Sequence, residues 1–193
     1  MLFSTKTLHL RDGQQLLLRS PRVQDTEPML DYMRLIYSQT PYLLHYPEDF
    51  HKTAEQERSF LEGMINSPNA VMIVCEADGE IVGTCQLNLN QKIKTHHRAS
   101  IGISLAQKYW GLGIGTALME ELISIARQHG VEQLELEVFE GNERAIGLYQ
   151  KMGFVQVCAL PDAIRLKDGR SLALLTMIKK MPNNTEDEVT PKS

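Results

Sequence analysis

Cysteine is scarce in this chain, and the few cysteines are scattered. The 193 residues include only three, Cys75, Cys85 and Cys158, and no two of them form a C-x-x-C pair. An odd number at such wide spacing argues against a disulfide framework and against a four-thiolate zinc site. We therefore expect a protein of the reducing cytoplasm whose cysteines pack rather than react.

The chain also lacks a basic excess and any long apolar run. Its 20 Lys and Arg residues against 24 Asp and Glu residues give a formal net charge of -4, whereas nucleic-acid-binding proteins normally carry a basic excess or a basic stripe. No uncharged apolar run approaches the roughly 18 residues of a membrane span, and the N-terminus shows no signal-peptide pattern. We expect neither a nucleic acid nor a membrane as partner.

Metal-ligand patterns are missing as well. His96 and His97 are adjacent, and neighbouring residues on a strand point to opposite faces, so this pair is not expected to converge on one ion. We expect no metal site.

The first half of the chain contains turn signals between short strand patterns. Asp-Gly pairs at 12–13 and 78–79 predict two β-hairpins, one within residues 7–21 and one within 69–90. Apolar residues recur at helical spacing over 25–37, with Asp25 as N-cap, and over 53–65. Residues 97–105 alternate as a further strand.

The second half alternates helices and strands. An apolar helical stripe runs from Ile114 to Gly130, a glycine suited to closing a helix. A strand over 131–139 follows, then a helix from Asn142 to Gly153, and strands over 154–160 and 171–180. This order predicts one mixed α+β domain over residues 1–182, with a mostly antiparallel central sheet and helices on both faces. The polar, acidic residues 183–193 are predicted to be a disordered tail.

The stretch YWGLGIGTAL (109–118) places glycines at alternate positions directly before a helix: Gly111, Gly113 and Gly115. Without a Cβ in the way, backbone amides can approach a ligand closely, and the first turn of a helix offers unpaired N–H groups to an anion. The pattern therefore favours a phosphate or pyrophosphate site. A turn that merely permits tight strand-to-helix packing is the alternative.

Two common nucleotide motifs fit this stretch poorly. A P-loop needs a lysine after its last glycine, but Thr116 follows Gly115. A dinucleotide fingerprint would require its third glycine at position 116 and would open the first βαβ unit of the chain. Glu135 and Glu137 do lie about where a ribose-binding acid would be expected, so that interpretation stays open as an alternative.

A second motif, LELEVFEGNERAIGLYQKMGF, spans residues 134–154. Asn142 and Tyr149 are seven positions apart, which on a helix brings them within about 20° of alignment, with Ala145 between them. One helix face therefore carries an amide, a small residue and a phenol. Together the two motifs resemble the GCN5-related N-acetyltransferase family, and the resemblance covers roughly residues 70–180.

This resemblance implies acetyl-coenzyme A as acetyl donor and a set of residues that bind it. Those implied to hold its pyrophosphate form the glycine turn, Gly111, Gly113, Ile114, Gly115 and Thr116. Those implied to pair with its pantetheine arm lie on the preceding strand, Ile103, Ser104 and Leu105. Asn142 is implied to contact the cofactor, and Tyr149 to protonate the departing thiolate. The family usually has Arg or Gln where this chain has Trp110, at the start of the turn, so one polar cofactor contact is expected to be missing.

Acetyl transfer to an amine also needs a base, because a lysine-type amine with a pKa of about 10.4 is almost fully protonated at neutral pH. Glu137 precedes Tyr149 by twelve residues, the spacing of the catalytic glutamate in the peptide α-amine acetyltransferases that the segment resembles. We expect Glu137 to be that base, although a solvated acid on a half-exposed strand is the alternative. Many relatives have a glutamate where this chain has Ser100, which is a poor base. Backbone N–H groups near Ile103 are expected to polarise the carbonyl.

The expected function is transfer of an acetyl group to a primary amine of a small molecule or protein. The alternative is a catalytically weak sensor or interaction module that binds acetyl-coenzyme A. The loop over 42–51 is expected to line the acceptor pocket or to be an ordinary surface loop, and its polar candidates are Tyr42, His45, Tyr46, Glu48 and Asp49. Homodimers are common in the family, so a homodimer is expected here.

Overall fold

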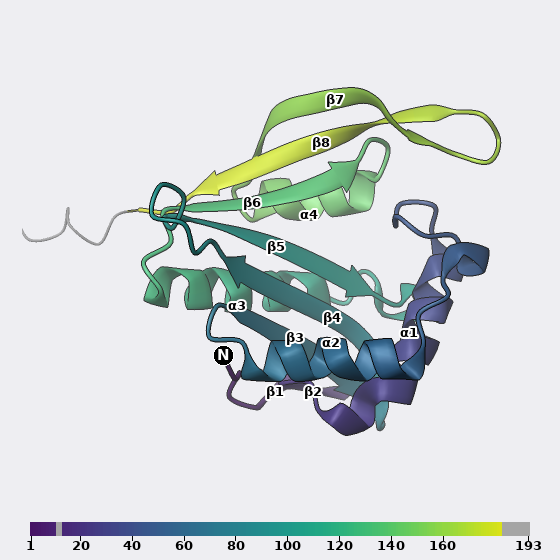
Figure 1. The fold of residues 1–193 in the computed structure, drawn as a ribbon, viewed down its shortest axis with the longest axis vertical. Helices are drawn as coiled ribbons and strands as arrows, with labels where there is room; N and C mark the ends of the chain where they lie inside the picture. The colour runs from purple at the N-terminus through teal and green to yellow at the C-terminus, as the bar shows by residue number, and fades with distance from the viewer. Residues whose placement is uncertain (11–12, 183–193) are drawn as a thin grey trace, which may run out of the picture.

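One eight-stranded sheet organises the protein (Figure 1). The computed structural model describes residues 1–10 and 13–182. Within them the strands, in chain order, are β1 Lys6–His9, β2 Gln15–Arg19, β3 Ala70–Ala77, β4 Glu80–Leu89, β5 Arg98–Leu105, β6 Gln133–Phe139, β7 Val155–Arg165 and β8 Ser171–Lys180. Their order across the sheet is β1-β2-β3-β4-β5-β6-β8-β7. Only β5 and β6 run parallel, which confirms the predicted mostly antiparallel α+β sheet.

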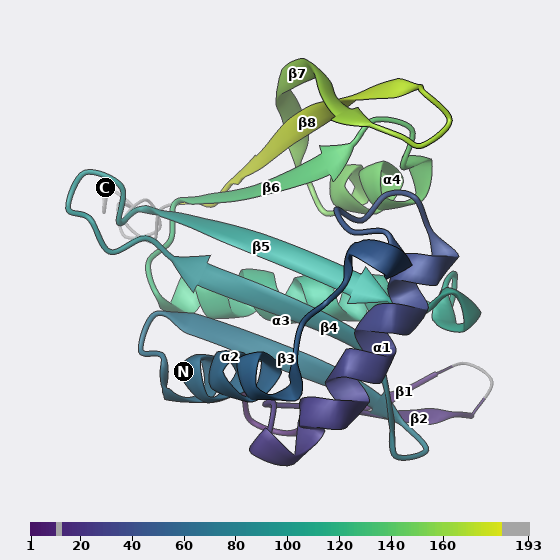
Figure 2. The same ribbon diagram turned by 45° about the vertical axis from the view of Figure 1, so that its right-hand side comes forward.

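Helices cover both faces of this sheet, as predicted. The four α-helices are α1 Thr26–Gln39, α2 Ala54–Asn66, α3 Ile114–Gln128 and α4 Glu143–Lys151. Helices α1 and α2 lie on one face and α3 on the other, while α4 lies beside β6 (Figures 1 and 2). Helix α3 buries its predicted stripe against the sheet, with Leu118 and Leu122 fully buried. No helix in the described part of the chain is both long and apolar enough to cross a membrane.

The helix ends follow local capping chemistry, with one exception. Thr53 accepts a hydrogen bond from the amide of Gln56 (3.2 Å) at the start of α2, and Gly130 after α3 takes the predicted left-handed conformation (φ +68°). Asp25 does precede α1, but its side chain makes no hydrogen bond to the helix. Its carboxylate instead accepts two bonds from the Arg19 guanidinium (2.7 and 2.8 Å). The predicted capping role of Asp25 in α1 is therefore wrong.

The turn predictions have mixed outcomes. Asp78 and Gly79 both have positive φ (50° and 85°) in the tight turn between β3 and β4, which confirms that hairpin. The other predicted turn residue, Asp12, and the predicted tail at 183–193 lie outside the described residues. Strand β7 is longer than predicted and runs through Pro161. Strand β7 is at the edge of the sheet, and its pairing with β8 is interrupted between Leu160 and Ile164, so proline removes no ladder hydrogen bond there.

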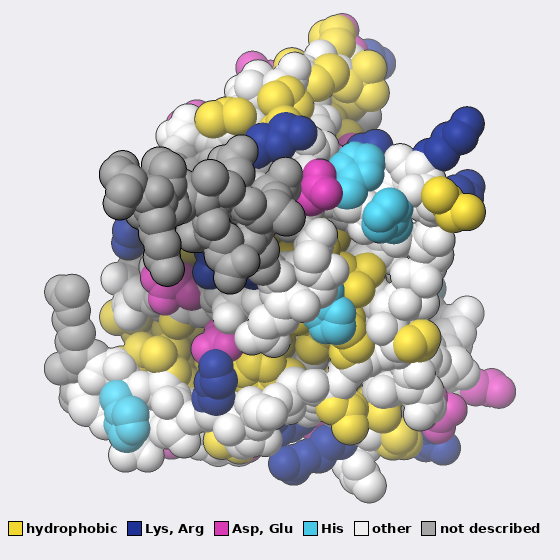
Figure 3. Space-filling model, turned by 90° about the vertical axis from the view of Figure 1, so that its left-hand side faces the viewer, with side chains coloured by type: hydrophobic (Ala, Val, Ile, Leu, Met, Phe, Trp, Pro, Cys, Tyr) yellow, Lys and Arg dark blue, Asp and Glu magenta, His cyan; other side chains and the backbone are white. Residues whose placement is uncertain are grey.

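Strand β7 is also exposed along its length. Its apolar side chains at Val155, Val157 and Leu160 are each more than half exposed. Figure 3 shows hydrophobic side chains at the top of the molecule, where the β7–β8 hairpin lies in Figure 1.

The central feature of the fold is a split in the sheet between β5 and β6. The two strands pair only where Arg98–Ser100 faces Gln133–Glu135. Beyond that point β5 stays with β4 as far as Leu105, and β6 stays with β8 as far as Phe139. The amide of Ala106 donates to β4, so strand alternation turns the N–H and C=O groups of Leu105, Ile103 and Ile101 toward the split.

Candidate active site

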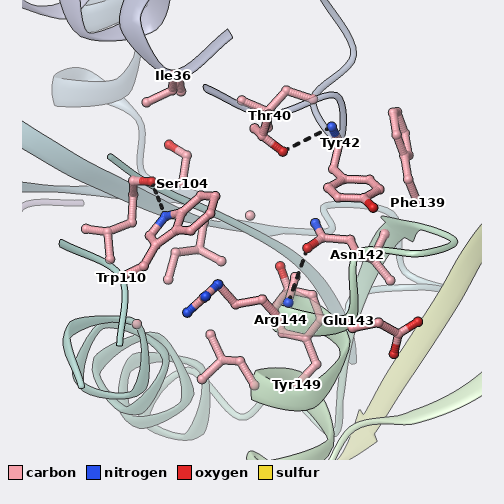
Figure 4. Close-up of a pocket in the computed structure, with 18 of the residues that line it drawn as sticks. Ile36, Thr40, Tyr42, Ser104, Trp110, Phe139, Asn142, Glu143, Arg144 and Tyr149 are labelled. Carbon is pink, nitrogen blue, oxygen red and sulfur yellow. Dashed lines mark hydrogen bonds between the residues drawn. The ribbon is translucent and has the colours of Figure 1, made fainter. Parts of the chain in front are cut away.

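A cavity of about 920 Å³ opens at this split. Its walls come from β5, the glycine turn, β6, α4 and the segment after α1, and Figure 4 shows side chains from several of these elements facing it. All but one of the predicted site residues line it: Ile103, Ser104, Leu105, Trp110, Gly111, Gly113, Gly115, Thr116, Glu137, Asn142 and Tyr149. Ile114 is the exception, because its side chain is fully buried in the core. It can offer a ligand only its backbone.

The glycines of the turn are needed for two different reasons. Gly111 and Gly113 have φ of +78° and +85°, and a Cβ at either position would meet no atom within 4 Å. Their left-handed backbone, rather than crowding, favours glycine there. At Gly115 a Cβ would lie 3.1 Å from Cδ2 of Leu148, so this glycine allows α4 to pack close to α3. Gly115 is thus explained by helix-to-helix packing, not by the strand-to-helix packing of the alternative, and Gly111 and Gly113 place no side chain over the backbone of the turn.

The start of α3 is suited to an anion. Gly113 is the N-cap and supplies no side-chain hydrogen bond, so the first amides of the helix are left for an external partner. Lys151 lines the cavity close by, and its Nζ lies 3.4 Å from Oγ1 of Thr116. The unpaired amides and this ammonium fit a pyrophosphate group.

Trp110 and Arg144 stack on each other in the cavity wall, and Arg144 adds a positive charge to that of Lys151. The indole Nε1 of Trp110 donates to the carbonyl of Leu105 (2.7 Å). The guanidinium of Arg144 lies over the indole ring, 4.9 Å from its centroid, as Figure 4 shows. Arg144 thus brings a positive charge to the part of the cavity wall where the family's usual Arg or Gln is replaced by Trp110. Arg144 was not among the residues predicted from the sequence, although its place in the first turn after Asn142 was a usable signal.

Asn142 and Tyr149 lie on the cavity side of α4. The Asn142 Oδ1 accepts from the amide of Ala145 (3.3 Å) and caps the helix, which leaves its NH₂ group for the cavity. The Tyr149 side chain is buried, with its ring near that of Phe154, and its hydroxyl has no hydrogen-bond partner among the described residues. Burial raises the pKa of Tyr149 to about 12, so the phenol keeps its proton at physiological pH.

The two acids of β6 have different surroundings. Glu135 receives two hydrogen bonds from the Arg98 guanidinium, one of them 2.7 Å long, which lower the pKa of its carboxyl group. Glu137 lines the cavity and forms no ion pair among the described residues. Ser100 is exposed, pairs with Glu135 across the strands, and is not part of the cavity wall. Among the described residues, the two carboxylate residues that line the cavity are Glu137 of β6 and Glu143 at the start of α4.

The loop after α1 contributes to the opposite wall of the cavity, but only in part. Tyr42 lines the cavity beside Gly141, and Pro41, Leu43 and Leu44 line it too. Tyr46 and Glu48 instead contact Lys167 of the β7–β8 hairpin. His45 packs against the ring of Tyr37. Of the polar loop candidates, Tyr42 is the one that lines the cavity.

The two adjacent histidines are not on a strand, so the geometric argument made for them is wrong. His96 and His97 lie in the turn before β5, with ring centroids 6.1 Å apart. Within residues 1–10 and 13–182, no three His, Cys, Asp or Glu side chains gather as a metal-binding set.

A sheet split beside an uncapped helix start, with a phenol on the next helix, is the arrangement that the resemblance implies for a transferase that binds a phosphate-bearing acyl carrier. Comparison with known proteins agrees: the sequence model of the Acetyltransferase (GNAT) family matches residues 30–154. The chain belongs to this family, whose members use acetyl-coenzyme A as acetyl donor.

Relatives and solved structures support the assignment. The chain is 30% identical to an N-alpha-acetyltransferase of Sulfurisphaera tokodaii over 78% of this chain and 86% of that protein. It is 32% identical to the L-amino acid N-acetyltransferase AaaT of Escherichia coli, over 48% of this chain and 58% of that protein. A GNAT acetyltransferase structure from Streptococcus pneumoniae matches with a TM-score of 0.79 at 25% identity, covering 86% of this chain and 99% of that one. The fold is also that of yncA from Salmonella typhimurium, whose structure includes its cofactor acetyl-CoA (TM-score 0.73, 17% identity, covering 92% and 98%).

Proposed function

We propose that this protein transfers the acetyl group of acetyl-coenzyme A directly to a primary amine. The observation that carries the proposal is the single cavity that joins the glycine turn, the free edge of β5 and the Tyr149 hydroxyl. The residues fit the donor: amides of the turn, Arg144 and Lys151 suit its phosphates, and the outward groups of β5 suit an extended amide-containing arm. The bound donor supplies the activated acetyl group.

The residues of the chain then divide the remaining chemistry. Glu137 takes a proton from the acceptor ammonium, because only the neutral amine is a nucleophile. The outward N–H groups of β5 near Ile103 stabilise negative charge on the acetyl oxygen, an effect worth roughly 3 kcal/mol for one preorganised donor. Tyr149 gives its proton to the departing thiolate, and the second proton that the nitrogen loses as the amide forms restores the phenol. The new bond is amine nitrogen to acetyl carbon, the broken bond is acetyl carbon to sulfur, and no protein nucleophile is needed.

Thiol release from acetyl-coenzyme A, measured with a panel of primary amines, tests this function. We expect amine-dependent release of one thiol for each acetylated product, with the product identified by mass. The panel should include peptides with a free N-terminus, free amino acids and simple alkylamines. Calorimetric binding of acetyl-coenzyme A without turnover of any amine would instead support the sensor.

Replacement of the proposed base should produce a pH-dependent loss. In Glu137→Gln we expect kcat/KM at pH 7 to fall by about 100-fold, within the range of general base catalysis. The deficit should shrink as pH rises toward the pKa of the amine, about 10.4, because the free amine then no longer needs a base. Initial rates from pH 6.5 to 10 measure this. Glu135→Gln, two residues away on the same strand, is the matched control and should change the rate less than twofold. A pH-independent loss would argue against the assigned role.

Domain organisation, cellular location and oligomeric state are three further predictions. We infer that residues 1–182 act as one domain, since all described strands join one sheet. Cys75 and Cys85 are buried, but Cys158 is exposed, so its predicted packing is wrong. A cytoplasmic location is supported by these three unpaired cysteines. A homodimer is supported by the exposed edge strand β7, because unpaired strand edges invite pairing. Sedimentation velocity would measure the oligomeric state.

A further inference from the structure

A second, smaller cavity lies between the sheet and helices α1 and α2. Its volume is about 250 Å³. It shares with the active-site cavity the residues Ile36, Leu43 and the β5 segment 102–104. The β5 segment that we assign to the acetyl group therefore also borders this second space.

The second cavity contains a buried carboxylate with a free oxygen. Glu57, in the first turn of α2, is 1% exposed. Its Oε2 pairs with Nζ of Lys52 at 2.5 Å, but its Oε1 has no hydrogen-bond partner. Among the described residues, no other buried side-chain oxygen or nitrogen lacks a partner. Buried polar atoms are normally hydrogen-bonded, and an unpaired one is destabilising. Since one water occupies about 30 Å³, the cavity is larger than a single bridging water requires.

Lys52 shows which chemical group this environment accepts. Its ammonium forms an ion pair with the Glu57 carboxylate and lies 4.2 Å from the centroid of the Phe60 ring. A carboxylate beside an aromatic face favours an ammonium ion. The Lys52 side chain is 30% exposed, so it occupies one carboxylate oxygen from the solvent side and leaves the other free.

The remaining walls combine polar side chains, Thr84, Gln86 and Ser104, with apolar ones that can adapt their shape. The apolar ones include Met29 and Met33 of α1 and Met72 of β3. Methionine side chains are flexible and fit irregular apolar groups. A short chain of methylene groups that ends in an ammonium would match both these walls and Glu57.

We propose that this second cavity binds the distal ammonium of a diamine acceptor, through Oε1 of Glu57, while the other amine of that acceptor is acetylated beside Ile103. The inference rests on the proposed acetyltransfer, and it adds the class of acceptor. Acceptors would be molecules in which a primary amine and a second cation are joined by a short aliphatic chain.

Matched acceptors test the proposal on the wild-type protein. We would compare diamines of four to six carbons with the n-alkylamine and the amino alcohol of the same length. We expect kcat/KM for the best diamine to exceed that of both matched compounds at least tenfold, mainly through KM. Equal turnover of the three would overturn the proposal, and equal turnover of diamine and amino alcohol would overturn the claim for a cation.

Two variants should shift this preference in opposite directions. Glu57→Gln should reduce the diamine preference to within twofold and leave n-alkylamine turnover unchanged, which also shows that the variant is folded. Lys52→Gln frees the second carboxylate oxygen and should lower KM for the diamine about threefold or more. A Lys52–Glu57 pair with a purely structural role predicts that both variants change all three acceptors alike, which would overturn the proposal.

A binding measurement separates this inference from the proposed function. Diamine should raise the melting temperature of the wild-type protein without acetyl-coenzyme A, and Glu57→Gln should abolish the shift. If no amine is turned over, the proposed function fails, and this thermal shift alone then decides whether the cavity binds diamines. Absence of the shift up to millimolar diamine, together with equal turnover of the matched acceptors, would overturn the site.

Discussion

Replacing Tyr149 with phenylalanine should lower kcat by about 100-fold and leave KM for acetyl-coenzyme A nearly unchanged. General acid catalysis contributes roughly 100- to 10,000-fold, and the hydroxyl is the only group that the substitution removes. Folding should not suffer, because the hydroxyl has no hydrogen-bond partner among the described residues. The melting temperature of Tyr149→Phe should therefore be close to that of the wild type. Steady-state kinetics and calorimetric binding of acetyl-coenzyme A check both statements.

The raised pKa of this phenol gives the prediction a pH signature. With a pKa of about 12 in the folded protein, Tyr149 stays protonated from pH 6 to 10, so kcat should show no decline from its ionisation in that range. Folding raises this pKa from about 10, so the folded state holds the phenol proton more tightly than the unfolded chain does. The contribution of the protonated phenol to the free energy of unfolding is complete below pH 10 and is lost as pH rises toward 12. Tyr149→Phe should lack this pH dependence. Unchanged turnover in the variant at every pH would rule out the proposed acid.

Local sequence patterns predicted most of the scaffold because the relevant forces are local. The Asp78-Gly79 turn and the helix predicted over 53–65 each depend on a few neighbouring residues, and both are present. The failures involve partners distant in sequence or structure. Asp25 looked like the cap of α1, but Arg19, from the preceding strand, takes its carboxylate. The predicted strand ended before Pro161, whereas β7 continues because its pairing with β8 is interrupted between Leu160 and Ile164 at the sheet edge.

The same distinction holds for the site. Spacing within one helix was enough to bring Asn142 and Tyr149 to a common face, and both line the cavity. The stacking of Arg144 on Trp110 joins α4 to the glycine turn, a contact that no periodicity reveals. Glu57 was passed over for a similar reason. Its burial depends on α1, α2 and the sheet together, so an acidic residue in a helix first turn gave no sign of it.

The second large effect is expected at Gly113. Its φ of +85° is strained for any side chain, and most of all for a β-branched one. In Gly113→Val the backbone must either keep that strain, at about 1–3 kcal/mol, or rotate and displace the amides at the start of α3. A valine side chain would also enter the space beside them. We expect KM for acetyl-coenzyme A to rise about 100-fold, consistent with loss of one or two charge-assisted hydrogen bonds of roughly 1.5–3 kcal/mol each.

Gly79 offers a matched control for this substitution. It has the same φ of +85°, and a Cβ there also meets no atom within 4 Å, but it lies in the β3–β4 turn and is not part of the cavity wall. Gly79→Val should therefore lose a similar amount of folding stability and keep its KM for acetyl-coenzyme A within twofold. Chemical denaturation and donor-saturation kinetics on both variants separate backbone strain from ligand contact. If the two substitutions raised KM equally, the turn at 111–113 would not be the phosphate site, because strain alone would then account for the loss.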